Sequence, residues 1–426
     1  MKQIRYHQHI LLLLTLTLFA CGEKKTTDSS NAGDGQLVTF HVNAPPSTVE
    51  PLLLSELADS VSYVALETTK ETLTDGGVQY GDRYYTIINE DRLLCFDKSG
   101  KYLHQIGRKG QGPEEYPKMY DYRSFKVDPK NNWIYIVANN ETKVFDENGK
   151  YVKSLTGEMW NHSPCFIYNN LAYITDYYSP FKIIDTRDNQ IVRSNIEMEY
   201  RKKFWKELTV DKAEKEGKRW YNREGSYYIS HFSNDRLYYW TVYYDTVMMA
   251  KGIETKGIEV KPYCLIIPEN KYKPENKIDG DEKLSTLQPI ILRMYVCNDK
   301  ILLAVRYYAS IEERKDFLLN KDMKYCYWVV CDLKDGSVTY HANYIINDLD
   351  GGPNIKSINF SSSFYEAEAL YSLSAEDLKN DKEIYNSYFT DGVEAKLKDQ
   401  EGKFQRLLEP LEDDANPIIR TIHWKE

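Results

Sequence analysis

A plan of strand-like runs recurs along the first half of the chain and constrains its fold more than any other feature. In each copy an apolar, aromatic run is followed by a polar turn, a second run that ends before or at an aspartate, and a further turn. The copies lie at residues 84–103, 133–152 and 171–189. The aspartates Asp97, Asp146 and Asp185 are 49 and 39 residues apart. A spacing of about 44 residues is typical of one four-stranded blade of a β-propeller.

The runs have the composition of β-strands, because Tyr, Val, Ile, Thr and Trp crowd into them while Asn, Asp and Gly separate them. Gly100 and Gly149 follow two of the aspartates, at turns where a tight hairpin needs positive φ. Later copies are less regular, at residues 237–248 and 301–331. Near-continuous apolar runs suit sheets that neighbouring blades cover on both faces. The sequence therefore predicts a single all-β domain over residues 37–426.

The two ends of this domain are predicted to meet. A strand at residues 60–66 is expected to pair with a strand at residues 418–424 and so complete one blade. Closing the domain in this way would bury two sheet edges that otherwise invite aggregation.

Composition excludes several other classes of protein. With 42% hydrophobic and 13% aromatic residues the chain is not disordered. No apolar run reaches the roughly 18 residues that a membrane-spanning helix needs. The net charge of −9, without a basic block, argues against a nucleic-acid partner.

Short helical insertions are predicted at residues 199–218, 312–319 and 393–408.

Residues 1–20 have the features of an export signal. Lys2 and Arg5 give a positive start, and the apolar stretch of about 11 residues that follows is too short to span a bilayer as a helix. The stretch ends in Leu18-Phe19-Ala20-Cys21-Gly22, which resembles the bacterial lipobox, although Phe19 is bulkier than its usual occupant. The resemblance implies that the Cys21 thiol is acylated and becomes the new N-terminus. The alternative is an ordinary cleaved signal with a chance cysteine.

Residues 21–36 contain almost no apolar side chain and predict a flexible, solvated tether. About 15 such residues reach roughly 20 Å. Removing Lys2 and Arg5 from the 55 basic residues leaves 53 against 64 acidic ones, a charge of −11. Lipid, rather than attraction to anionic head groups, should therefore hold the protein at a membrane. We expect a protein that is lipid-anchored in the bacterial cell envelope, at the periplasmic or cell-surface face of the outer membrane.

A glycine-rich segment follows the first copy of the repeat. Residues 107–117 read Gly-Arg-Lys-Gly-Gln-Gly-Pro-Glu-Glu-Tyr-Pro, with strand-like runs at 125–128 and 133–136 behind them. This segment resembles the inter-blade connectors of NHL-type propellers. Together with residues 57–69 and 416–422, it makes the whole mature chain similar to the six-bladed β-propeller lipoproteins common in Bacteroidetes. The resemblance implies six four-stranded antiparallel blades and an envelope location, whereas the repeats above number about five, and it implies no reaction.

Arg108, Glu115 and Tyr116 make this segment a candidate ligand-binding site. Its glycines do not form a phosphate-binding loop, because the run lacks the Gly-Lys-Ser/Thr ending and does not open a helix. Connectors between blades converge near a mouth of the central channel, and this one carries a cation, a carboxylate and an aromatic ring within nine residues. Such groups orient a polar ligand. The alternative is a purely structural crossing.

No catalytic or metal-binding motif is evident in the sequence. The six histidines of the mature chain form no pair at i, i+2 or i, i+4, and neither His-Glu-x-x-His, Cys-x-x-Cys nor Gly-x-Ser-x-Gly occurs. We therefore predict no metal and no cofactor. Six cysteines besides Cys21 lie mostly in apolar runs, where a free thiol is usually buried, and at most one disulfide is expected. Cys326 and Cys331 should point to opposite faces of one strand and not pair.

These features favour a non-catalytic binding or interaction module of the cell envelope, with a glycan or a peptide as its ligand. Paired tyrosines such as Tyr227-Tyr228, Tyr238-Tyr239 and Tyr243-Tyr244, among the 36 of the chain, would offer flat rings to such ligands, although strands also favour tyrosine. One alternative is an NHL-like enzyme, a lyase or hydrolase with or without a metal, whose site lies at the central channel. Another is a scaffold subunit of an outer-membrane protein complex.

Overall fold

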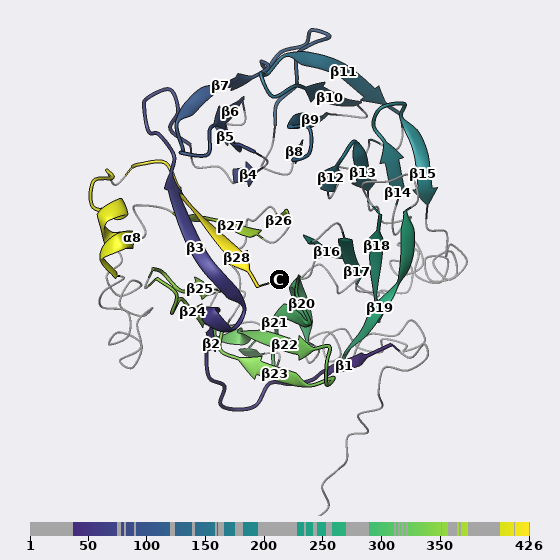
Figure 1. Ribbon diagram of the computed structural model, residues 1–426, viewed down its shortest axis with the longest axis vertical. Coiled ribbons are helices and arrows are strands. Elements are labelled where there is room, and N and C mark those ends of the chain that lie inside the picture. The colour runs from purple at the N-terminus through teal and green to yellow at the C-terminus, as the bar shows by residue number, and fades with distance from the viewer. Residues whose placement is uncertain are drawn as a thin grey trace, which may run out of the picture. The chain divides into compact units, whose positions relative to one another are not determined.

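The computed structural model describes the chain in stretches between Leu37 and Lys425. The described residues are 37–74, 78–80, 82–88, 91–119, 124–138, 141–157, 160, 166–174, 182–194, 228–233, 236–241, 245–252, 258–269, 289–310, 312, 313, 316, 319, 323–350, 352–356, 364–365, 368–373, 401–412 and 414–425. Their secondary structure is almost entirely β-strand (Figure 1). The strands form several four-stranded antiparallel sheets, so the predicted all-β class is confirmed.

Most sheets consist of four strands that follow one another along the chain, and we name these sheets by their strands. The β4–β7 sheet has β4 (Val78–Tyr80), β5 (Tyr84–Ile88), β6 (Arg92–Phe96) and β7 (Tyr102–Ile106). The β8–β11 sheet has β8 (Phe125–Asp128), β9 (Trp133–Ala138), β10 (Glu141–Phe145) and β11 (Tyr151–Thr156). The β12–β15 sheet has β12 (Phe166–Tyr168), β13 (Leu171–Ile174), β14 (Lys182–Asp185) and β15 (Gln190–Ser194). The β16–β19 sheet has β16 (Tyr228–Ser233), β17 (Arg236–Thr241), β18 (Thr246–Lys251) and β19 (Glu259–Pro268). The β20–β23 sheet has β20 (Ile290–Cys297), β21 (Lys300–Arg306), β22 (Cys326–Asp332) and β23 (Val338–His341).

One further four-stranded sheet joins the two ends of the described chain, and we call it the terminal sheet. Its strands are β26 (Phe364–Tyr365), β27 (Glu368–Leu373), β28 (Ile418–Trp424) and β3 (Ala58–Ala65). β3 pairs antiparallel with β28 along its length, from Ile418 opposite Ala65 to Trp424 opposite Ala58 (Figure 1). The predicted pairing between the early strand and the C-terminal strand is therefore confirmed.

The residues before β3 form two short strands, β1 and β2, and each pairs with a strand of another sheet. β1 (Thr39–Val42) pairs parallel with β19, and β2 (Leu52–Leu53) pairs parallel with β24 (Tyr344–Ile346). β24 also pairs with β25 (Ile355–Lys356), which completes a small three-stranded sheet. Single turns of 3-10 helix, η1 (Leu54–Glu56) and η4 (Met323–Tyr325), precede β3 and β22.

The aspartate repeated in the sequence has a structural reason. It follows the third strand of a sheet, and its carboxylate accepts hydrogen bonds from the turn that leads to the fourth. Oδ1 of Asp97 accepts from the backbone N–H groups of Ser99 at 2.8 Å and Lys101 at 3.0 Å. Asp146 makes the same two contacts with the residues two and four positions after it. An aspartate that caps a turn in this way fixes the hairpin without help from distant residues.

Glycine in these hairpins also serves the packing of one sheet on the next. Gly100 and Gly149 have φ angles of 86° and 78°, in the region that favours glycine. The carbonyl of Gly149 accepts a hydrogen bond of 3.1 Å from the N–H of Gly107, which belongs to the preceding connector. A Cβ on Gly149 would lie only 2.7 Å from the carbonyl oxygen of Gln105. The hairpin of one sheet is thus fastened to the end of its neighbour.

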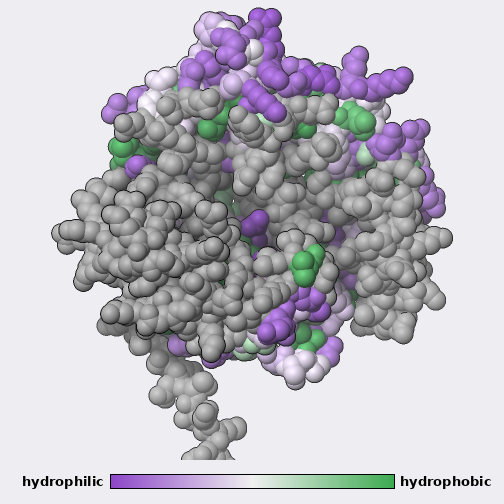
Figure 2. Space-filling view, turned by 180° about the vertical axis from the view of Figure 1, so that it is seen from behind, coloured by the Kyte–Doolittle hydropathy of each residue, from purple (hydrophilic) through white to green (hydrophobic). Residues whose placement is uncertain are grey.

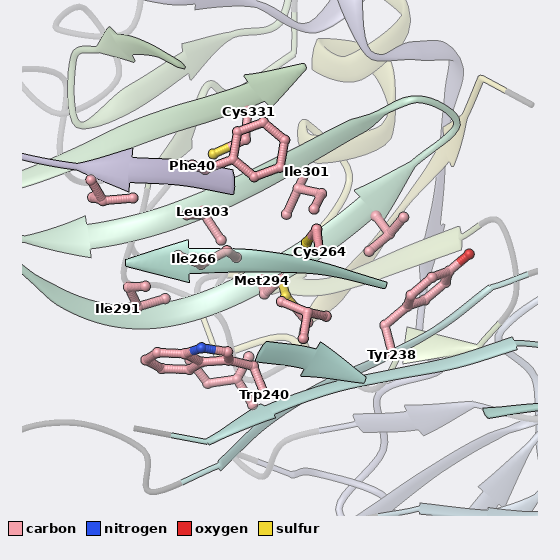
Figure 3. Close-up of a cluster of buried hydrophobic side chains, with 14 of the residues drawn as sticks. Phe40, Tyr238, Trp240, Cys264, Ile266, Ile291, Met294, Ile301, Leu303 and Cys331 are labelled. Atoms are coloured by element: carbon pink, nitrogen blue, oxygen red, sulfur yellow. The ribbon is translucent and has the colours of Figure 1, made fainter. Parts of the chain in front are cut away.

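The core consists of apolar clusters between consecutive sheets. Clusters join the β4–β7 sheet to the β8–β11 sheet, that sheet to the β12–β15 sheet, and that sheet to the β16–β19 sheet. The β16–β19 and β20–β23 sheets share a further cluster (Figure 3). The terminal sheet contacts both the β20–β23 sheet and the β4–β7 sheet. Contacts therefore lead from each sheet to the next and return to the first, and all five residues of β5 are buried as a result.

The predicted helical insertions are confirmed only where the structure describes them. Helix α8 (Glu401–Leu408) lies within the predicted 393–408 and buries Phe404 and Leu408 against Ile418. Four described residues of the predicted 312–319, at 312, 313, 316 and 319, are helical. The predicted insertion at 199–218 lies outside the described residues.

On the face that Figure 2 shows, the described residues form no single large hydrophobic area. Hydrophilic residues cover most of its described part, and hydrophobic ones occur in small separate groups. Exposed side chains such as Leu103, Val152 and Ile191 lie on the fourth strands of three sheets. Scattered exposure of this kind is ordinary for a globular domain. Among the described residues no helix is long and apolar enough to cross a membrane.

Candidate functional site

The three predicted ligand-binding residues all lie in the segment that joins β7 to β8, and we call residues 107–118 the glycine connector. Arg108 is the second residue after β7, and a parallel bridge pairs Lys109 with Tyr116. The N–H of Tyr116 donates to the carbonyl of Arg108 at 3.1 Å, and the N–H of Gly110 donates to the carbonyl of Tyr116 at 2.9 Å. These bonds hold the two sides of the connector together, so the residues between them form a closed loop.

Glu115 fills this loop with its carboxylate. Oε2 accepts a hydrogen bond of 2.8 Å from the backbone N–H of Gly112, and Oε1 lies 2.6 Å from Nε of Arg108. The backbone hydrogen bond and, to a smaller extent, the charge of Arg108 hold the pKa of Glu115 below its usual value. A Cβ at Gly110 would overlap Oε2 of Glu115. Glycine at position 110 therefore lets the loop close without displacing the carboxylate of Glu115.

Arg108 stands on the outside of this loop. Its side chain is 78% exposed, whereas that of Glu115 is 19% exposed. The contact with Glu115 engages only Nε, and a guanidinium has four further N–H groups on its two amino nitrogens. An exposed ion pair of this kind adds little stability. What it provides is orientation, because the contact holds the Nε side of the guanidinium against the carboxylate.

Tyr116 does not take the role predicted for it. Its side chain is fully buried in the cluster between the β4–β7 and β8–β11 sheets, with its ring edge-on to Phe145 at 5.9 Å between centroids. Its hydroxyl donates to the carbonyl of Asp91 at 3.2 Å, and burial raises its pKa to about 12. Burying an aromatic ring between two sheets is more favourable than leaving it in water, provided that the hydroxyl finds a partner. Tyr116 therefore anchors the connector and has no exposed surface for a ligand.

Two lysines fasten the connector on either side. Nζ of Lys143, on β10, donates to the carbonyl of Pro113 and to the carboxylate of Glu141, both at 2.8 Å. Lys143 is 7% exposed, so these bonds compensate a charge that is nearly buried. Lys109 pairs with Asp91, which lies just before β6. The connector is thus held over the seam between two sheets by residues of both.

A second polar cluster, which the sequence analysis missed, lies between β24 and β25. Oδ1 of Asp350 accepts from the side-chain amide of Asn347 at 2.6 Å, from the N–H of Gly352 at 2.9 Å and from the hydroxyl of Tyr63 at 3.3 Å. Burial raises the pKa of Tyr63, so its hydroxyl stays protonated. Residues 347–352 are rich in Asn, Asp and Gly, and such runs mark turns. This composition could have indicated a polar turn at this position.

Arg420 on β28 reaches into the same segment and is only 2% exposed. It donates from Nη1 to the carbonyl of Pro353, and a longer contact of 3.4 Å joins it to the carbonyl of Asn354. The buried arginine therefore ties the segment between the β20–β23 sheet and the terminal sheet to the strand that pairs with β3. Backbone carbonyls carry no residue-type signal, so no pattern in the sequence reports this contact.

The remaining chemistry-bearing residues show no grouping of their own. Among the described residues no three His, Cys, Asp or Glu side chains are placed to hold a metal ion. Burial lowers the pKa of His231 to about 3, and its neutral ring accepts at Nδ1 from the N–H of Val296 at 2.9 Å. The five described cysteines are buried and form no disulfide with one another, whereas Cys165 and the predicted lipidation residue Cys21 lie outside the described residues.

Comparisons with known proteins agree with the β-rich fold and show the family of the chain. The family described as "Domain of unknown function (DUF4934)" matches residues 37–423. No curated protein matches the chain. A crystal structure of a "putative exported protein" from Bacteroides fragilis is similar with a TM-score of 0.54 at 16% identity, covering 92% of this chain and 100% of that one. A member of the DUF4221 family from Bacteroides vulgatus has a TM-score of 0.41 at 10% identity, covering 87% of this chain and 97% of that one.

Proposed function

The chain belongs to the DUF4934 family, and from this premise we propose that it is a six-bladed β-propeller lipoprotein of the bacterial cell envelope that binds a polar ligand through the glycine connector. The proposal is for binding without catalysis. The ligand classes are glycans and peptides, because the hydroxyl, carboxylate and carbonyl oxygens of both are acceptors for a guanidinium.

Six blades account for the order in which the sheets pack. The five sheets of consecutive strands, together with the terminal sheet, give six units of four strands. The return of contacts from the terminal sheet to the β4–β7 sheet supports a closed ring. In that ring the terminal sheet is the closing blade, with β3 from one end of the chain and β26–β28 from the other.

The lipid anchor rests on the sequence Leu18-Phe19-Ala20-Cys21-Gly22 with a polar tether behind it. The similarity to an exported protein of Bacteroides fragilis supports the envelope location. We expect Cys21→Ala to move the protein from the membrane fraction to the soluble fraction when cells are fractionated. A variant that stays in the membrane fraction, processed as the wild type is, would contradict the anchor.

One observation carries the binding proposal, namely the Arg108 guanidinium held in a fixed orientation at the surface. Glu115 engages Nε and is itself held by the backbone of the connector. Tyr116 and Lys143 fix that backbone to the two sheets below it. A group with free donors that is already oriented loses little conformational entropy when a ligand binds, which favours recognition at this position.

The test is a comparison of two arginine variants on glycan and peptide arrays. Arg108→Ala should reduce binding to any ligand that the wild type retains by at least about tenfold, the effect of losing roughly 1.4 kcal/mol. Arg187→Ala is the matched control, because Arg187 is also an exposed arginine, 54% exposed, that pairs with a carboxylate two positions before it, Asp185 at the end of β14, at 2.6 Å. Both variants should melt like the wild type.

Three results would count against the proposal. Undiminished binding by Arg108→Ala would remove the connector from the site, and equal losses in both variants would indicate a general effect of charge. Turnover of a bound glycan or peptide that chelators abolish would favour the metal-dependent enzyme instead. Tyr116→Ala is unsuited to this test, because it would open a cavity in the seam between two sheets.

A further inference from the structure

The β16–β19 sheet carries one strand more than its neighbours. β1 lies along β19 and runs parallel to it, whereas every pair within the β16–β19 group is antiparallel. The β4–β7, β8–β11, β12–β15 and β20–β23 sheets consist of four strands each. The β16–β19 group is therefore complete without β1, which is added to its outer edge as an extended segment.

β1 fits this edge through two side chains at alternate positions. Phe40 lies opposite Ile266 and Val42 opposite Pro268, and both β1 side chains are fully buried. His41 between them is exposed. This alternation is the pattern expected of a strand that buries one face only.

The Phe40 ring enters the seam between two sheets. It belongs to the cluster that joins the β16–β19 and β20–β23 sheets, together with Cys264, Ile301 and Cys331. Figure 3 shows the ring beside Cys331, with Ile301 close by. The space between the two sheets thus forms a pocket for one large apolar side chain at the edge of the β16–β19 sheet.

Backbone N–H groups of β19 and of the residue after it also hold β1. The N–H of Leu265 donates to the carbonyl of Val38 at 2.8 Å, and the N–H of Glu269 donates to the carbonyl of Val42 at 2.7 Å. These contacts depend on the conformation of the added segment and not on its residue types. Main-chain pairing of this kind gives affinity, while the pockets for alternate side chains give selectivity.

The segment that connects β1 to β2 behaves as a linker. Residues 43–51 contain three prolines, which favour an extended chain. Three hydrogen bonds near its ends hold it. The N–H of Asn43 donates to the hydroxyl of Tyr340 at 2.7 Å, and the N–H of Ala44 donates to Oε2 of Glu269 at 3.2 Å. The carbonyl of Glu50 accepts from the N–H of Ala342 at 3.0 Å. β1 is therefore attached to the remainder of the domain as a peptide on an extended linker.

We propose that the β19 edge is a strand-acceptor site for extended peptides with an aromatic and a β-branched residue two positions apart. In this structure the chain's own residues 37–43 occupy the site. A segment of another exported chain with the same pattern displaces them and binds parallel to β19. This inference does not depend on the glycine connector, which lies on other sheets.

The first experiment measures binding of a fluorescent peptide with the sequence of residues 36–44 to the mature protein. Phe40→Glu places a charge in the apolar pocket and should release β1 from the edge of β19, because an unpaired charge is costly to bury. We expect this variant to bind the peptide at least tenfold more tightly than the wild type, whose site is filled. A control peptide with Thr39 and Phe40 exchanged should bind the variant at least tenfold more weakly. Equal binding of both peptides, or no binding by a folded variant, would overturn the proposal.

A second experiment covers the case in which Phe40→Glu does not fold. Thr39 and Leu265 are paired in the β1–β19 register, so the double variant Thr39→Cys with Leu265→Cys should form a disulfide across the pair on oxidation. Excess peptide added before oxidation should lower the yield of this disulfide several-fold, and the exchanged peptide should not. A yield that neither peptide changes would show that β1 is not displaced and would overturn the proposal.

Discussion

The glycine connector leads from β7 to the next sheet, and the segment from β24 to β25 joins two strands of the small three-stranded sheet, yet the two segments use arginine in opposite ways. Arg108 is 78% exposed and pairs through Nε with a carboxylate of its own loop. Arg420 is 2% exposed and donates to the backbone carbonyls of Pro353 and Asn354. The first arginine keeps donors that face water, whereas the second uses its donors inside the protein.

The difference shows which connector is free to act on other molecules. In the glycine connector the carboxylate comes from the loop, so the guanidinium is oriented without being buried. In the β24–β25 segment the carbonyls of Pro353 and Asn354 receive Arg420, and Asp350 is already engaged with Asn347 and Gly352. The first arrangement suits a recognition site, and the second suits a structural fastening between sheets.

The largest effect should come from removing the buried arginine. Arg420→Ala leaves two carbonyls in the core without their donor and opens a cavity, so the free energy of unfolding should fall by about 3–5 kcal/mol. Arg108→Ala should change it by less than about 0.5 kcal/mol, as surface substitutions do. Urea unfolding followed by tryptophan fluorescence measures both changes.

A third variant separates the causes of that loss. Arg420→Met retains most of the side-chain volume but no donor, so its deficit reports the hydrogen bonds alone. If Arg420→Ala and Arg108→Ala proved equally stable, the contrast between the two connectors would fail.

Contacts between residues close together in the sequence could be predicted, and most contacts between residues far apart in the sequence could not. The caps at Asp97 and Asp146 follow from residues two to four positions away, so their repeat could be recognised. Arg108 and Glu115 could be placed together because they share one short loop. The pairing of β3 with β28 could be predicted because a strand at each end needs a partner for its edge.

The contacts that the sequence did not reveal depend on partners far along the chain or on backbone groups. Tyr116 is buried because Phe145 of the next sheet covers it, and nothing near residue 116 indicates that neighbour. Arg420 contacts Asn354, 66 residues away, through a carbonyl that any residue would supply. β1 was not predicted either, since its edge partner β19 lies more than 200 residues later.

A pair of glycines offers a finer comparison of the two connectors. A Cβ at Gly352 would overlap the hydroxyl of Tyr63, which is held in place by Asp350, whereas a Cβ at Gly110 would overlap the carboxylate of Glu115, at the end of a side chain that can change rotamer. Gly352→Ala should therefore reduce the free energy of unfolding by about 1–3 kcal/mol, the usual effect of overpacking. Gly110→Ala should cost less than about 1 kcal/mol and should instead displace the Glu115 carboxylate from Arg108.

Binding distinguishes these two variants as clearly as stability does. Gly110→Ala should lose affinity for an array ligand almost as Arg108→Ala does, and Gly352→Ala should retain it. A Gly110→Ala protein with full affinity would show that Glu115 does not orient Arg108.

The smallest effect is a pH dependence confined to the glycine connector. The fold holds the pKa of Glu115 below its ordinary value of about 4.3, so the carboxylate form is the one that the folded state favours. This contribution is fully present above the ordinary pKa and is lost as pH falls through the lower, folded value. Ligand affinity should therefore be constant from about pH 7 to pH 5 and should decline once Glu115 is protonated, to the level of Glu115→Gln.

Glu115→Gln is also the control, because it keeps every other carboxylate, and its affinity should not show this decline. Identical pH profiles for the two proteins, measured at constant ionic strength while both remain folded, would mean that the orientation of Arg108 owes nothing to the charge of Glu115.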